Sequence, residues 1–179
     1  MSGLLAVSRV IDWLNERFGW ICDYMLAAAC LISAGNAFMR YAFSYSSNAY
    51  LEIQWYLFGA AVMLGASYTL KRNEHVRVDV IYGQLSDRGR LWVDLFGFII
   101  FLLPVTLIML YLCVPFFQRS FASGEVSMNA GGLTLWPIKL MLPLGFFLLL
   151  LQTISEIIKR ISALSGLIEL ETKYTKPLQ

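Results

Sequence analysis

The residues that could do chemistry are few in this sequence, and none of them forms a catalytic set. The single histidine, His75, lies in a charged stretch with no nucleophile placed for a serine–histidine triad. One histidine also cannot supply both axial ligands of a membrane haem. The cysteines Cys22, Cys30 and Cys113 lie in apolar segments without CxxC spacing, which predicts small packed side chains. With no phosphate-binding glycine loop either, we expect no enzyme activity, no cofactor and no metal site.

Four charged residues stand at the ends of apolar segments, where a bilayer makes charge expensive. Arg40 and Glu52 flank one short polar connection, and Arg119 and Lys139 flank another. Such side chains either reach the membrane surface individually or pair with each other. For Arg119 we favour the surface, and the short connection permits a structural ion pair between Arg40 and Glu52. Lys139 could contact a lipid phosphate or a partner subunit.

The elements that carry these residues are apolar blocks of membrane-spanning length. Hydrophobic residues make up 58% of the 179-residue chain and charged residues 15%, against about 25% charged in soluble domains. About 20 apolar residues cross the hydrocarbon core as a helix, and the blocks lack the alternation of barrel strands. We predict one membrane domain, 1–179, with transmembrane helices at about 19–39, 53–70, 95–117 and 136–158.

An amphipathic helix is predicted over residues 4–18, ahead of the first span. Leu4, Val7, Ile11 and Leu14 recur at steps of three and four and share one face. We expect this helix to lie in the cytoplasmic interface, and a simple extension of the first span is the alternative.

Spans two to four carry further signals. Gly59 and Gly65 allow close approach of another helix, and with Trp55 and Trp136 they are candidates for contact with a partner or lipid. Pro104 and Pro115 are expected to bend span three.

The connection between spans two and three is a semi-polar arm. Its valines alternate with charged residues, which permits a strand, although we expect an interfacial helix or an irregular arm. His75, Arg77 and Asp79 are further candidates for partner or lipid contact, although such charges more often face solvent. Residues 162–179 read as a polar tail.

Orientation follows from the basic residues. Arg40, Arg119 and Lys139 fall on one side of the predicted membrane, and the other 11 of the 14 Lys and Arg residues fall on the opposite side. The positive-inside rule places both termini and the arm in the cytoplasm. The net charge of +2, spread over the segment ends, predicts no nucleic-acid partner. The predicted fold is therefore an all-α integral membrane protein with four transmembrane helices, an N-terminal interfacial helix and a cytoplasmic-side arm.

No predicted span has an acid or base near its centre, as a self-sufficient coupled transporter would need. A small four-helix exporter acting as a homodimer would need such an acid, and Asp23 lies too near the cytoplasmic end. A membrane anchor for a redox enzyme is weaker still, because paired histidines and CxxC motifs are missing.

A series of short motifs runs along residues 15–156. In chain order, the motifs are Arg40-Tyr41, Glu52 with Trp55-Tyr56-Leu57-Phe58, Gly65-Ala66, residues 71–79, Glu125-Val126-Ser127, Trp136-Pro137, Pro143-Leu144-Gly145 and Gln152. In this order and spacing they resemble the small membrane subunit, or DctQ type, of tripartite ATP-independent periplasmic (TRAP) transporters. One departure is that Glu52 is followed by Ile53 and Gln54, where many members have two adjacent acids.

The resemblance implies a non-catalytic subunit of the bacterial inner membrane. Its expected partners are phospholipid, a large multi-span subunit that moves substrate by an elevator motion driven by sodium, and a periplasmic binding protein that delivers organic acids. This chain would brace the large subunit and help to dock the binding protein, with Ser123 and Glu125 as docking candidates.

Overall fold

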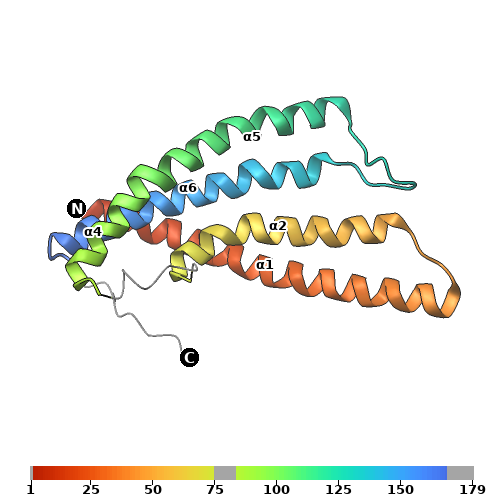
Figure 1. Ribbon diagram of the computed structural model, residues 1–179, viewed down its shortest axis with the longest axis horizontal. Coiled ribbons are helices and arrows are strands. Elements are labelled where there is room, and N and C mark those ends of the chain that lie inside the picture. The colour runs from red at the N-terminus through yellow and green to blue at the C-terminus, as the bar shows by residue number, and fades with distance from the viewer. Residues whose placement is uncertain (1, 75–83, 169–179) are drawn as a thin grey trace.

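The computed structural model of the chain describes residues 2–74 and 84–168, and within these ranges it is a bundle of long antiparallel helices. Two hairpins lie side by side, one made by α1 and α2 and the other by α5 and α6, with α6 next to α2 (Figure 1). The elements are α1 (Ser2–Phe43), α2 (Asn48–Arg72), α4 (Asp87–Gly97), the π-helical turn η1 (Phe98–Leu102), α5 (Leu103–Ser123) and α6 (Trp136–Leu164).

The bundle has two distinct ends, which we name for what they carry. The loop end holds the connections 44–47 and 124–135, and the terminal end holds the start of α1 and the end of α6 (Figure 1). Cap geometry sets some of the helix boundaries. The Ser47 side chain accepts a hydrogen bond from the Ala49 amide before α2, and Gly124 ends α5 in the left-handed region with φ 60°.

Among the described residues, three helical segments are long and apolar enough to cross a membrane: Gly3–Phe43, Asp87–Ser123 and Trp136–Leu164. They contain the predicted spans one, three and four. The predicted second span lies within α2, which is helical over its full length but is not among the three. Polar and aromatic side chains such as Gln54, Tyr56 and Tyr68 dilute the apolar character of α2.

The predicted interfacial helix at 4–18 is not a separate element, because α1 runs without a break from Ser2 to Phe43. The polar side chains Ser8 and Asn15 are 2% and 0% exposed, whereas on the apolar face Leu4 and Val7 are half exposed and only Ile11 is buried, with Leu14 against the core. The helix turns its polar side chains inward because they find hydrogen-bond partners on α6.

The interior of the bundle is small or polar, and its surface is rich in large apolar side chains. A core cluster of Cys22, Ala61, Leu64 and Leu148 joins α1, α2 and α6. Most of the other fully buried side chains are polar. They are Asn15, Glu52, Ser67, Thr106, Ser120, Gln152, Thr153, Ser155 and Ser162. This inverted arrangement suits a chain surrounded by hydrocarbon, where polar groups must be paired internally.

The small residues predicted to allow close helix approach do so within the chain. A Cβ on Gly59 would lie 3.3 Å from Ile138 of α6, and a Cβ on Gly65 would lie 3.6 Å from the Cys22 sulfur of α1. The tightest crossing uses Gly145 of α6, where a Cβ would meet the Met63 carbonyl oxygen at 2.6 Å.

The two prolines of span three, Pro104 and Pro115, lie in different backbone settings. The π-helical turn η1 directly precedes α5, which has Pro104 at its start. Since proline has no N–H to donate, the backbone can widen at this point without losing a helical bond. Pro115 lies within the continuous helix α5.

Candidate functional site

Glu52 organises the loop end of the bundle. It lies in the first turns of α2, is only 1% exposed, and faces the 124–135 connection. Its carboxylate accepts hydrogen bonds from the Ser127 hydroxyl, from Asn129 Nδ2 at 2.7 Å and from the Leu133 amide at 2.6 Å. Three donors from one loop converge on one buried anion, so the loop is fixed against α2. We call this arrangement the loop clasp.

Further contacts close the loop clasp. Asn48 donates to the Ala130 carbonyl at 3.1 Å, and the Tyr56 hydroxyl donates to the Thr134 carbonyl at 3.3 Å. Within the loop, Val126 and Thr134 form an isolated antiparallel bridge. The 124–135 connection is therefore anchored to α2 at several points.

Lys139, one of the residues expected at a lipid or partner surface, forms an internal ion pair instead. It binds Glu125 of the loop and lies 4.4 Å from the centre of the Phe116 ring. The hydrogen bond from Lys139 is the main reason that the pKa of the Glu125 carboxyl lies below its ordinary value. This pair ties the loop to α6 as Glu52 ties it to α2.

The structure does not bring Arg40 and Glu52 together. The Glu52 carboxylate is occupied by the loop, and no ion pair is found for Arg40 within the described residues. Arg40 instead lines a cleft between α1 and α2, together with Gln54. Sequence proximity permitted the pair, but the loop residues supply three donors and outcompete it.

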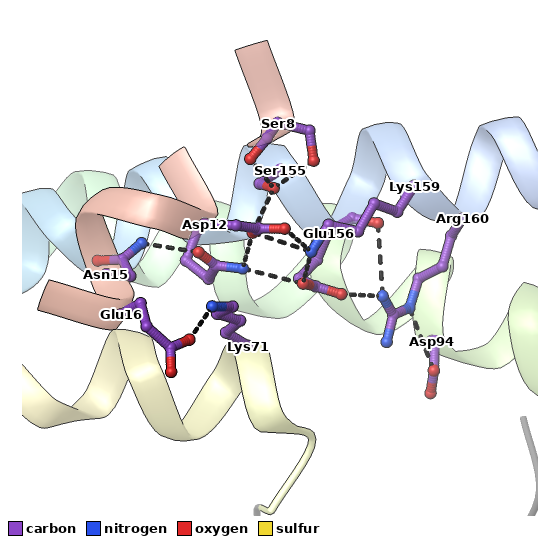
Figure 2. Close-up of polar contacts among 11 residues, drawn as sticks. Ser8, Asp12, Asn15, Glu16, Lys71, Asp94, Ser155, Glu156, Lys159 and Arg160 are labelled. Atoms are coloured by element: carbon purple, nitrogen blue, oxygen red, sulfur yellow. Dashed lines mark hydrogen bonds and ion pairs between the residues drawn. The ribbon is translucent and has the colours of Figure 1, made fainter. Parts of the chain in front are cut away.

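The terminal end holds a larger polar network between α1 and α6 (Figure 2). Asn15 donates to Gln152 Oε1 at 2.7 Å, and the Gln152 amide donates to Asp12 at 3.0 Å and to Glu156 at 2.9 Å. Lys159 reaches Asp12 and Glu156, each at 2.7 Å. The two helices are thus joined by alternating donors and acceptors in a mostly buried layer.

Ion pairs at the same end join α6 to α4 and, separately, α1 to α2 (Figure 2). Arg160 pairs with Glu156 and, at 3.2 Å, with Asp94 of α4. Glu16 of α1 pairs with Lys71 and Arg72 at the end of α2. Every acid in this group has a basic partner, so the layer is electrically balanced and connects all the helices that meet at the terminal end. We call it the terminal network.

The chemistry that these groups permit is structural. Within residues 2–74 and 84–168, no three His, Cys, Asp or Glu side chains converge as a metal site would require. The buried acids are hydrogen-bonded or ion-paired, which leaves none poised as a general base. Such networks set the relative positions of helices, as a scaffold requires.

The remaining predicted residues are spread over the surface. Trp55 is 57% exposed on α2, and the Trp136 ring packs on Phe121 at 5.5 Å. Ser123 ends α5 and donates to the Ser120 carbonyl at 3.3 Å. The arm residues His75, Arg77 and Asp79 lie outside the described ranges.

Sequence reasoning did not identify the terminal network as a site. A signal was present, because Gln152, Glu156 and Lys159 recur at helical spacing and therefore share one face of α6. Asp12 and Asn15 form a matching polar face on α1. The separation of more than 130 residues hid the pairing.

Comparison with known proteins gives two matches. Residues 29–163 match the protein family described as "Tripartite ATP-independent periplasmic transporters, DctQ component". The chain is also 30% identical over 83 residues to the C4-dicarboxylate TRAP transporter small permease protein DctQ of Vibrio cholerae, a match that covers 46% of this chain and 36% of that protein. The chain thus matches well under half the length of this curated relative, and no solved structure matches. Because the family match spans most of the chain and follows an all-helical fold with several candidate spans, this protein belongs to the DctQ component family of TRAP transporters.

Proposed function

We propose that this chain is the small membrane subunit of a TRAP transporter, crossing the bacterial inner membrane four times with both termini in the cytoplasm. Family membership supports the subunit assignment. The fourth crossing would be α2, which runs beside α1 and α6 through the length of the bundle (Figure 1). The basic residues concentrated at the terminal end support the orientation.

The length of α1 bears on how the bundle sits in the membrane. Its 42 residues extend about 63 Å, roughly twice the 30 Å of hydrocarbon. Tilting rarely exceeds about 40°, so part of α1 must project beyond the hydrocarbon. The basic residues at the terminal end support the proposal that the projecting end is the cytoplasmic one.

The proposed role is to brace a large elevator-type subunit and hold its fixed part in place. The single observation that carries this proposal is the terminal network, whose charges are paired with one another and leave no buried ion free for transport among residues 2–74 and 84–168. The surface that such a chain offers for recognition is apolar. A stripe of exposed side chains on α2, formed by Trp55, Phe58 and Val62, is a candidate for contact with the large subunit or with lipid.

The loop clasp supports a second role at the periplasmic side. A loop fixed by Glu52 and Lys139 offers a stable surface on which a periplasmic binding protein can dock. Ser123 and Glu125 remain the docking candidates, since they flank the start of this anchored loop. The matched Vibrio cholerae protein is named for C4-dicarboxylate, and sodium-driven uptake of organic acids is the transport activity proposed for the complex.

The test has two stages. Mild-detergent purification of the tagged chain from native membranes should recover a stoichiometric multi-span partner. Proteoliposomes with that partner and a binding protein should then show sodium-driven uptake that is lost when this chain is omitted. A lone chain or a homodimer, with transport by the chain itself, would instead support the exporter alternative.

A matched pair of variants tests the docking role. Glu125→Gln weakens the pair with Lys139 and changes the proposed docking surface, whereas Asp87→Asn removes an exposed acid at the other end of the bundle. Uptake should fall with the first variant and stay unchanged with the second, at equal amounts of assembled membrane complex. Equal uptake by both variants would refute a docking role for Glu125.

A further inference from the structure

A polar cleft opens at the loop end between α1 and α2. It has a volume of about 600 Å³. The residues that line it are Ser33, Asn36, Ala37, Arg40, Tyr41, Leu51 and Gln54. A groove between two membrane helices would ordinarily be filled by apolar side chains, so an arginine, two amides and two hydroxyls in one cleft need a physical explanation.

The cleft carries a positive charge that the chain does not neutralise. The sequence supplies two acids to the loop end, Glu52 and Glu125. Glu52 is occupied by the loop clasp, and Glu125 pairs with Lys139. No counter-ion for Arg40 is found among residues 2–74 and 84–168. A cation at the end of a membrane helix must then be compensated from outside the chain or by water.

The same cleft contains a donor without an acceptor. Gln54 Nε2 is buried in the wall of the cleft and has no hydrogen-bond partner among the residues that the structure describes. Such groups are rare in folded proteins, and an unseen ligand is one of their standard explanations. Asn36 accepts a hydrogen bond from Ser46 through Oδ1, which leaves its NH₂ group as the part of the amide that can still donate. Arginine and two amide NH₂ groups together are a set of donors that suits an oxyanion.

We propose that this cleft binds the phosphate of a phospholipid headgroup, with Arg40 as the ion-pairing residue and Gln54 and Asn36 as hydrogen-bond donors. The guanidinium fork fits phosphate oxygens in a two-point contact. The proposal rests on placing the loop end at the membrane surface, as above, and does not depend on the identity of the transporter partner.

The position of the cleft, at the proposed membrane surface, favours a lipid phosphate over a free anion as its ligand. Tyr41, at its rim, is 94% exposed, and tyrosines concentrate where membrane helices meet headgroups. Leu51, on the α2 wall with Gln54, is 44% exposed and adds apolar surface to the cleft. The cleft therefore offers both polar and apolar surface, and a phospholipid has groups that suit each.

The experiment is a lipid titration of the delipidated full-length chain, read by native mass spectrometry. Phosphatidylglycerol is the probe, and diacylglycerol with the same acyl chains is the control without phosphate. Arg40→Gln should lower phosphatidylglycerol affinity about tenfold, as loss of a charge-assisted contact does. Gln54→Leu should lower it about fivefold, and diacylglycerol should bind all variants weakly.

Arg119→Gln is the matched control variant. Arg119 is an exposed arginine at the loop end, on α5, and does not line the cleft. Phosphatidylglycerol binding should be unchanged in this variant. Circular dichroism and gel-filtration elution should be the same for all three variants, which separates loss of binding from loss of folding.

Several results would overturn the proposal. One is equal phosphatidylglycerol affinity for Arg40→Gln and the wild-type chain. A second is Arg40-dependent binding of inorganic phosphate as tight as that of the lipid, which would indicate a free-anion site. A third is unchanged lipid binding together with loss of the large subunit in Arg40→Gln, which would assign the counter-ion to a partner carboxylate. If no large subunit copurifies, the proposed function fails while this titration still decides the lipid site.

Discussion

The contact between Gly145 of α6 and the main chain of α2 offers the sharpest test of the packing. A Cβ at position 145 would lie 2.6 Å from the Met63 carbonyl oxygen and 2.9 Å from its carbonyl carbon. Ordinary contacts begin near 3.4 Å, so Gly145→Ala requires the two helices to separate locally by roughly 0.8 Å. Overpacking of this kind costs about 1–3 kcal/mol.

The higher helix propensity of alanine acts on stability in the opposite direction. Alanine stabilises a helix relative to glycine by about 0.5–1 kcal/mol. We therefore expect Gly145→Ala to lower the free energy of unfolding by about 1–2 kcal/mol. Gly35→Ala is the matched control, because a Cβ there meets nothing within 4 Å and only the favourable term applies. The two variants should move stability in opposite directions.

The assay is equilibrium unfolding of the full-length chain in mixed micelles, followed by circular dichroism. Adding Met63→Ala to Gly145→Ala should not restore stability, because the nearest contact is to the Met63 main chain. If Gly145→Ala proves as stable as Gly35→Ala, the close crossing of α2 and α6 is not as described. Rescue by Met63→Ala would show that side chains, not backbones, limit the approach.

Three further predictions concern the polar groups. Glu156→Ala leaves the buried Arg160 without its nearest acid and should lower the free energy of unfolding by about 3–5 kcal/mol. The control is Asp87→Ala, which breaks an exposed pair with Arg90 and should lower the free energy of unfolding by less than about 1 kcal/mol in the same assay. The lowered pKa of Glu125 means that its pair with Lys139 contributes stability above the ordinary carboxyl pKa of 4.5 and loses it only as the pH falls through the lower, folded value. An NMR titration of Glu125 should show a midpoint below 4.5 that moves up toward that value in Lys139→Gln, and an unmoved midpoint would exclude Lys139 as the cause. Glu52→Gln places an amide donor opposite the Ser127, Asn129 and Leu133 donors and should make the 124–135 loop sensitive to protease. Arg40→Gln should leave the loop protected. Equal protease sensitivity in both variants would instead support an Arg40–Glu52 ion pair.

Hydrophobic block length was enough to predict the helices, since the thickness of hydrocarbon sets the length of a crossing. Three of the predicted spans fall inside α1, α2 and α6, and the fourth, 95–117, runs from the end of α4 through η1 into α5. The helical segments that contain spans one, three and four are confirmed as candidate crossings. The family assignment is confirmed, and with it the expectation that the chain is a transporter component and not an enzyme.

The sequence could not show which face of each helix would point into the bundle. Apolar periodicity in residues 4–18 identified a shared face but not which of its residues would be buried, because in hydrocarbon apolar side chains such as Leu4 and Val7 lose nothing by facing outward. Hydrogen bonding decides the rotation instead, and Ser8 and Asn15 are buried because Ser155 and Gln152 lie opposite. Likewise, Glu52 does not pair with Arg40, because the 124–135 loop presents three hydrogen-bond donors to its carboxylate.

The pairing of α1 with α6 has a consequence for how the protein is made. Asn15 and Gln152 are separated by 137 positions, and Ser8 and Ser155 by 147, so these contacts cannot form until α6 has left the ribosome. Until then Ser8 and Asn15 of α1 lack their native partners. We expect a nascent chain halted before α6 to be recognised by membrane proteases, because these polar side chains are still unpaired.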